Sequence, residues 1–234
     1  MDDGFADELT ELRQGTGDPA KLSAAFLQYL PVAGATVATV GSVMGNETLS
    51  ATGYLAQRLD EWQFDLGEGP CWDAVGQARP VFETNFPANG GCRWPSLFAA
   101  ARTESIGAIF AFPMTVGTLQ IGAIDLYSHI PATLNTEQQH QASALADAIG
   151  QRVVRDALAS HASGHEAKTP FSRRLVHQAT GLVLAQVNVN AEDAVLLIQT
   201  HAHSTGLSMM ELSEQLLADR LRYVRVDGRI EVQS

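Results

Sequence analysis

The spacing of apolar residues changes along this chain, and the change limits the folds that it can adopt. Apolar and small polar residues alternate through residues 34–55, as in a β-hairpin, and segments 105–113 and 119–127 are typical of further strands. From residue 171 onward, apolar residues recur every three or four positions, which predicts helices. A sheet therefore belongs to the first part of the chain, and the last part is expected to be all helical.

A short polar segment separates these two parts. Residues 160–170 read SHASGHEAKTP and end in proline, which is typical of a linker. The predicted organisation is an N-terminal arm (1–17), an α+β domain whose antiparallel sheet is flanked by helices (18–160), a linker (161–170), and a small all-α bundle of three helices with a C-terminal tail (171–234).

Local signals predict further elements of the first part. Residues 2–17 are acidic and only weakly periodic, so they are expected to form a loose arm or a short leading helix. Asp18 before Pro19 predicts a helix that ends at Pro31. Residues 66–98 hold many Gly and Pro turns and are expected to be irregular.

Capping signals predict where later helices begin. Thr136 and Gln139 have the spacing of a capping box, which would open a helix that runs towards residue 160. Asn190 is a candidate N-cap for the second helix of the bundle, and Ser208 with Glu211 is a second capping-box spacing, at the start of the third.

The charge balance excludes broad electrostatic binding to a polyanion. The chain has 15 Lys and Arg against 26 Asp and Glu, a formal net charge of −11. Because nonspecific nucleic-acid affinity depends on cations that neutralise phosphates, any nucleic-acid contact must be local. The sequence has neither a secretory signal pattern near its start nor an apolar run as long as a membrane span, so a cytoplasmic protein that does not bind membranes is expected.

Three segments of the helical part share the order and spacing of a known family. They are residues 176–184 (VHQATGLVL), 191–197 (AEDAVLL) and 207–212 (LSMMEL). The pattern resembles the ANTAR family of RNA-binding modules in bacterial transcription antiterminators. Two positions depart from that pattern: Thr180 stands where the family usually has a lysine, and Gly206-Leu207 occupies the turn where an arginine is common. Ser213 also replaces a later small alanine of the family.

The first part, over about residues 30–158, is similar to the GAF domains that precede ANTAR modules in actinobacterial regulators. The similarity rests on the order of several short motifs: LGEGPC at 66–71, RPV at 79–81, RWP at 93–95, PM at 113–114 and IGAIDLY at 121–127. The resemblance implies a sensor domain. No cofactor is predicted, and a small-molecule effector of unknown identity is a possibility that the resemblance leaves open.

The ANTAR resemblance directs attention to the basic and polar residues of the bundle. Residues 171–234 have 6 arginines and 7 acids, whereas the body of the chain is strongly acidic. Arginine stacks on bases and binds phosphate in a forked geometry, which suits the unpaired loops of RNA. The predicted RNA-binding residues are Arg173, Arg174, His177, Thr180, Ser204 and Thr205.

Aromatic residues of the GAF-like part are candidates to line an effector pocket. The predicted lining residues are Trp62, Trp72, Trp94, Phe82 and Tyr127, with Phe86 and Phe98 as further members of the set. The alternative is that these side chains form the core, since a domain of this size needs several aromatics for packing.

The thiols and histidines carry weaker hypotheses. Cys71 and Cys92 would support a redox site if they were close together, and an ordinary packed role is the alternative. The pairs His161 with His165 and His201 with His203 lack a third ligand at a suitable spacing, so no metal site is predicted. The sequence shows no other catalytic motif, and the chain is not expected to be an enzyme.

The sequence therefore predicts a regulator of transcription antitermination. Its GAF-like domain would control an ANTAR-like module that binds a stem-loop of nascent mRNA, with no DNA partner. Apolar faces on residues 137–158 and 171–186 predict a homodimer. Two alternatives remain: a ligand-sensing regulator that binds proteins because its bundle has lost RNA affinity, and a thiol-dependent redox sensor or enzyme.

Overall fold

A computed structural model describes residues 3–40, 45–163 and 173–233. The chain divides into two compact units, Met1–Phe171 and Ser172–Ser234. No single helix among these described residues has the length and apolar composition of a membrane span. Helices α8 (Arg174–Val187) and α9 (Ala191–Thr205) have the length and apolar composition of a span only when they are taken together. The pair is bent by 106° where the two helices meet.

The first unit is built on an antiparallel sheet, as the alternating pattern predicts. In the described part of this unit, five strands lie in the order β2-β1-β5-β4-β3. They are β1 (Gly34–Thr39), β2 (Glu47–Ala51), β3 (Val81–Glu83), β4 (Ala108–Val116) and β5 (Leu119–Ser128). The central strands β1, β5 and β4 are almost wholly buried because helices cover both faces of the sheet. The α+β class is thereby confirmed.

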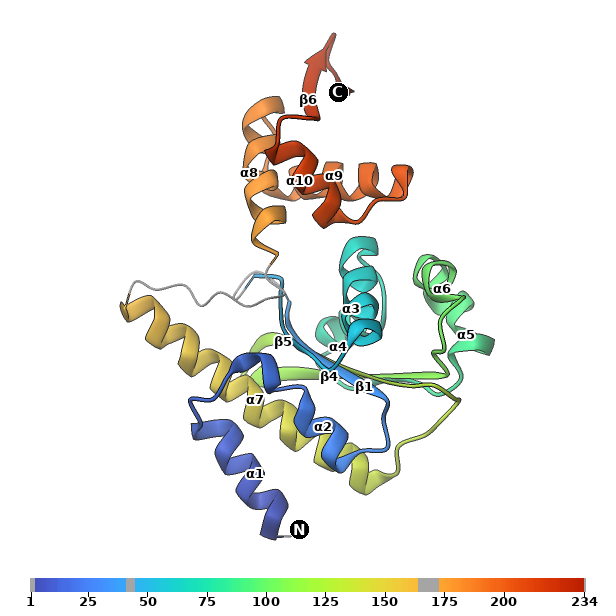
Figure 1. Ribbon diagram of the computed structural model, residues 1–234, viewed down its shortest axis with the longest axis vertical. Helices are drawn as coiled ribbons and strands as arrows, with labels where there is room; N and C mark the ends of the chain where they lie inside the picture. Colours follow the sequence, from blue (N-terminus) through green and yellow to red (C-terminus); the bar gives the residue numbers. More distant parts are fainter. Residues whose placement is uncertain (1–2, 41–44, 164–172, 234) are drawn as a thin grey trace. The chain divides into compact units, whose positions relative to one another are not determined.

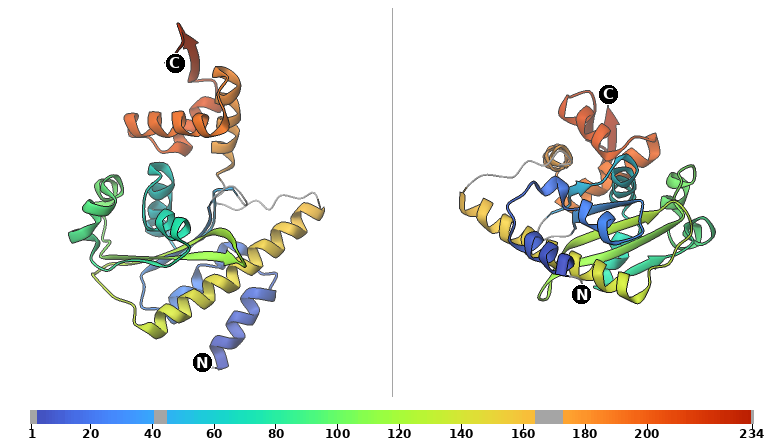
Figure 2. Two further views of the ribbon diagram at one scale, coloured as in Figure 1. Left: turned by 180° about the vertical axis from the view of Figure 1, so that it is seen from behind. Right: turned by 60° about the horizontal axis from the view of Figure 1, so that its bottom comes forward.

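One face of the sheet is covered by helices from the two ends of the unit (Figures 1 and 2). The long helix α7 (Thr136–Ser163) packs on β4, beside α1 (Asp3–Gln14) and α2 (Ala24–Tyr29). Phe26, Phe112, Leu145 and Ile149 are fully buried in this layer. The apolar face of α7 that predicted a homodimer therefore packs inside the unit.

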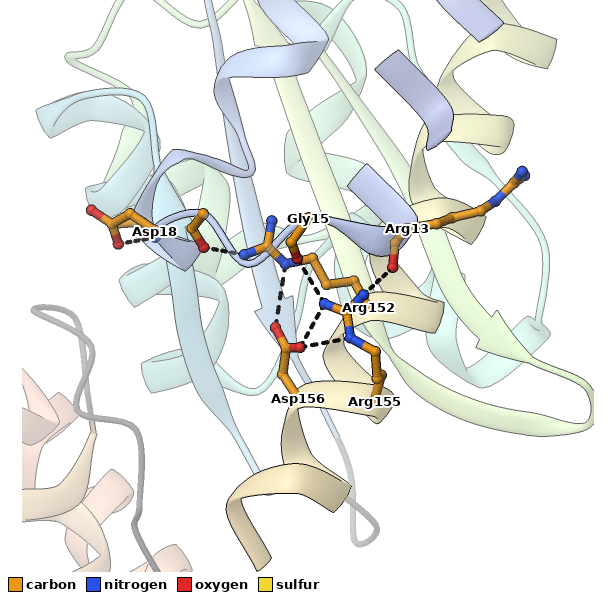
Figure 3. A network of polar contacts seen from close by, with 8 residues as sticks. Arg13, Gly15, Asp18, Arg152, Arg155 and Asp156 are labelled. Carbon is orange, nitrogen blue, oxygen red and sulfur yellow. Dashed lines mark hydrogen bonds and ion pairs between the residues drawn. The ribbon is translucent and has the colours of Figure 1, made fainter. Parts of the chain in front are cut away.

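The N-terminal segment is a helix that is fixed to α7 rather than a loose arm. Two arginines of α7 bind backbone carbonyl groups in the last turn of α1 and just after it: Arg152 donates to Gly17 O, and Arg155 donates to Gly15 O at 2.8 Å and to Arg13 O (Figure 3). Asp156 pairs with both arginines, at 3.3 Å from Arg152 and 2.7 Å from Arg155. The weak apolar repeat of α1 is sufficient to hold this helix in place, because its few apolar residues are buried against α7.

The opposite face is covered by short helices, and here the expectation of irregular structure over 66–98 is wrong. The helices are α3 (Tyr54–Leu66), α4 (Pro70–Gln77), α5 (Phe86–Arg93) and α6 (Pro95–Ala101). Pro70 and Pro87, which the sequence presents as turn signals, lie in the first turns of α4 and α5, and Pro95 opens α6; a missing N–H costs nothing at these positions.

Two predicted helix starts also need correction. The helix expected from Asp18 to Pro31 is a 3-10 turn (Pro19–Lys21) followed by the short α2. The capping box of α7 is formed one residue earlier than predicted: Gln138 N donates to Asn135 Oδ1 and Asn135 N donates to Gln138 Oε1, both at 2.9 Å. Asparagine is as strong a cap as threonine or stronger, so the register moves by one.

The second unit contains α8, α9 and α10 (Met209–Leu217), followed by a hairpin of β6 (Arg222–Val226) and β7 (Arg229–Gln233). Both predicted caps are confirmed: Asn190 accepts from Asp193 N at 2.8 Å, and Ser208 and Glu211 form the capping box. The hairpin differs from the C-terminal tail that the sequence predicts for this segment.

Candidate functional site

The predicted RNA-binding residues of α8 do not share one face. Arg174 and His177 are exposed one turn apart, whereas Arg173 is only 5% exposed and Thr180 only 8%. The Thr180 hydroxyl donates to Val176 O at 2.7 Å, inside its own helix. Arg174 and His177 are thus the members of this group that face solvent.

Ser204 and Thr205 lie at the other end of the bundle's first two helices. Both are exposed on the last turn of α9, and their hydroxyls donate to His201 O at 2.9 and 2.8 Å. Because α8 and α9 are each about 20 Å long and are bent sharply at their junction, this pair lies about 20 Å or more from the start of α8. The structure therefore divides the predicted set into two separate places.

The face of the sheet beneath α3 and α4 holds a buried polar network that the sequence analysis missed. Gln63 of α3 donates to Asp125 Oδ2 of β5 at 2.8 Å and accepts from Cys71 N at 2.9 Å. Asp60, one turn before Gln63, accepts from the hydroxyl of Thr48. The feature of the sequence that could have indicated this network is Asp125 itself, a single charged residue within an apolar strand.

Asp125 is held in an environment that disfavours its charge. Its pKa is raised from 3.8 to about 8, chiefly by burial and also by the nearby Asp60 carboxylate, while the hydrogen bond from Gln63 lowers it. Asp125 Oδ1 and the Oγ1 of Thr36, its register partner on β1, are buried with no hydrogen-bond partner among the described residues. This environment therefore favours the protonated form of Asp125 at neutral pH.

The glycine motif at 66–71 supports this network. Gly67 ends α3 in a left-handed conformation (φ 63°). At Gly69 (φ 141°) a Cβ atom would overlap the Gln63 side chain. Glu68 between them accepts from Leu97 N at 2.7 Å, which joins the α3–α4 turn to α6. The motif is needed for close packing around Gln63.

The motif at 93–95 has a structural role as well. The Arg93 guanidinium stacks on the Trp94 ring at 4.1 Å and lies 3.7 Å from Asp73 and 3.6 Å from Glu83. The Trp94 indole donates to Asp73 at 3.2 Å. These contacts attach the α5–α6 junction to α4 and β3.

The aromatic residues predicted to line one pocket are divided between the two faces of the sheet. Trp62, Trp94 and Tyr127 belong to the apolar layer under α3–α6, and Trp72 packs beside Cys71 in a neighbouring cluster. Phe82 belongs to the opposite layer, where its ring packs against Phe110 and Phe112, and it therefore cannot share a cavity with the others. Of the two further members, Phe86 is in the core and Phe98 packs against it.

The thiols and histidines occupy unrelated environments. Cys71 is buried at the start of α4 and Cys92 is exposed on α5, and neither forms a disulfide. His201 packs its ring against Tyr223 with 6.0 Å between centroids, and His203 is exposed. The His161 and His165 side chains lie outside the described residues.

Comparisons with known structures agree with the fold of the first unit. Free methionine-R-sulfoxide reductase from Neisseria meningitidis matches with 15% identity and a TM-score of 0.50, over 66% of this chain and 89% of that one. Type II free methionine-R-sulfoxide reductase from Thermoplasma acidophilum matches with 17% identity and a TM-score of 0.45, over 63% and 95%. At such identities the likeness concerns the fold alone. No curated protein matches the chain.

Family models account for both units. The model of the GAF domain matches residues 16–153, which is more than half of the chain, and the model of the ANTAR domain matches residues 170–217. This combination of domains is typical of a regulator. The chain belongs to the GAF domain family, and its GAF domain is followed by an ANTAR domain.

Proposed function

We propose that this protein is a cytoplasmic antitermination regulator, whose ANTAR domain binds a stem-loop of nascent mRNA under the control of its GAF domain. The observation that carries the proposal is the ANTAR match over residues 170–217, together with a bundle of α8, α9 and α10 in that region, in which α9 and α10 are capped. ANTAR domains in general bind RNA stem-loops.

The exposed residues of α8 are the first candidates for RNA contact. Arg174 and His177 lie on the solvent side of α8, where a guanidinium and an imidazole can reach phosphate or an unstacked base. Thr180 and Arg173 are assigned to packing, because both are buried. An RNA that also reached Ser204 and Thr205 would have to cross the bundle.

The GAF domain would act as the sensor. An effector controls RNA binding only if it binds two states of the protein with different affinity. The polar network around Gln63 and Asp125 is the feature of this domain best suited to report such a change, because Asp125 Oδ1 and Thr36 Oγ1 lack hydrogen-bond partners in the described structure.

The test measures binding of a labelled pool of RNA hairpins with random loops, over about 50 to 200 mM salt. The wild-type protein is expected to bind, and its affinity should fall as salt rises because phosphate contacts release counterions. Arg174→Ala should weaken binding, whereas Arg102→Ala, which removes the same charge from an exposed turn of the GAF domain, should not. Absence of binding by the folded wild-type protein at the lowest salt would refute the proposal.

A second candidate function has one specific observation in its favour. Thr180 replaces the lysine that is usual in ANTAR domains, and its hydroxyl is bonded within α8. A bundle without that cation could instead bind a protein. The same assay separates the two functions, since this candidate predicts no salt-dependent RNA binding.

A further inference from the structure

The β6–β7 hairpin lies beyond the segment that matches the ANTAR family, yet it is firmly attached to the bundle. Tyr223 is only 3% exposed; its backbone N–H donates to Gln186 Oε1 at 2.9 Å and its hydroxyl donates to Leu197 O at 3.1 Å. Burial raises the pKa of Tyr223 to about 12, so the phenol stays a donor. Arg225 donates to Val187 O at 2.9 Å, at the last turn of α8. The hairpin is thus a fixed part of this unit.

The cations of the second unit are concentrated at this hairpin. Four of its six arginines, Arg220, Arg222, Arg225 and Arg229, follow α10, and the other two stand at the start of α8. By contrast, α9 and α10 contain Glu and Asp residues but neither lysine nor arginine. Phosphate groups are repelled by carboxylates and attracted by cations, so the charge of this unit favours RNA at the hairpin.

The register of the hairpin sets which arginines face outward. Tyr223 points into the bundle, and side chains alternate along a strand, so Arg222 lies on the opposite, outer face. Arg229 lies on that face too, because it pairs with Val226, four residues along from Arg222. The two are therefore about 13 Å apart along the ribbon. Glu231, the partner of Val224, stands between them.

A hollow lies where the hairpin leaves α10. It has a volume of about 270 Å³ and is lined by Asp219, Arg220, Leu221, Arg222 and Gln233. Arg222 pairs with Asp219 at 3.1 Å, and both side chains are more than half exposed. Arg220 is also exposed. A guanidinium fork matches the geometry of a phosphate group, which fits a hollow of this size.

We infer that this hollow and the outer face of the hairpin form a second RNA contact, which binds the phosphate backbone of the stem-loop. The inference rests on the proposed function, and it adds Arg220, Arg222 and Arg229 to the residues that hold the RNA. Backbone contacts position an RNA without reading its sequence, so this surface contributes affinity rather than sequence specificity. The carboxylates of Asp219 and Glu231 repel phosphate and reduce that affinity.

The test uses the full-length chain and the same pool of RNA hairpins. The double variant R220A/R229A removes two exposed cations of this surface, and K21A/R102A removes two exposed cations of the GAF domain as the matched control. The hairpin variant should bind about tenfold more weakly near 0.1 M salt, and its log–log salt dependence should be shallower by about 1.4. The control should match the wild type in both.

A change of opposite sign gives an independent readout. Glu231→Gln removes a carboxylate between Arg222 and Arg229 and should tighten binding, whereas Glu192→Gln at the start of α9 should not. If the wild-type protein binds RNA and R220A/R229A has the same affinity and salt slope, this inference is overturned while the proposed function stands. Failure of the wild type to bind any hairpin would instead overturn the proposed function.

Discussion

Asp125→Asn should remove a large part of the pH dependence of the GAF domain's stability. The folded-state pKa of Asp125 is about 8, against 3.8 for an ordinary aspartate. Because the folded state holds this proton more tightly, the contribution of Asp125 to stability is fully present below pH 3.8 and is lost as pH rises to about 8. Asparagine has the same shape as the protonated acid and can still accept from Gln63.

The magnitude follows from linkage. Within this window, one proton bound only by the folded state changes the free energy of unfolding by about 1.4 kcal/mol per pH unit. From pH 5 to pH 7 the wild type should therefore lose about 3 kcal/mol that Asp125→Asn retains, equivalent to roughly 6–12 °C in melting temperature for a unit of this size.

The assay is denaturant unfolding at pH 5, 6 and 7, followed by tryptophan fluorescence. All three tryptophans lie in the GAF domain, so the signal reports that unit. Asp7→Asn, at an exposed position on α1, is the control and should follow the wild type. Parallel pH profiles for the wild type and Asp125→Asn would show that Asp125 is already ionised when folded, and the reasoning would fail.

Three further substitutions test other parts of the fold. Gly69→Ala should destabilise the GAF domain by about 2 kcal/mol or more, because φ is 141° and the new methyl group overlaps Gln63; tryptophan-monitored unfolding measures it, and a neutral result would contradict the packing described. Ser208→Ala should cost the ANTAR domain about 1 kcal/mol by removing the capping box, and circular dichroism should show a lower unfolding midpoint. An unchanged midpoint would mean that α10 does not depend on this cap. Arg152→Met should cost about 2 kcal/mol and speed amide exchange in α1, since it deletes the bond to Gly17 O; unchanged exchange would mean that α1 is held by its apolar face alone.

The amino-acid sequence alone determined the features that depend on near neighbours. The alternation of β1 and β5 and the helical repeat of α8 are local patterns, and each gave the correct element. The caps at Asn190 and Ser208 form within four residues of chain, so their spacing was enough. The order of short motifs was enough to predict both families.

Only the tertiary structure decided which side chains meet. Asp125 lies 62 residues from Gln63, and its raised pKa exists because folding buries it near a second carboxylate. Thr180 and Arg173 were placed with Arg174 by sequence proximity, yet packing buries the first two and exposes the third. The hairpin is fixed by Tyr223, whose partners Gln186 and Leu197 are more than 25 residues earlier. Burial and long-range pairing are properties of the assembled chain, because they depend on residues that no local pattern brings together.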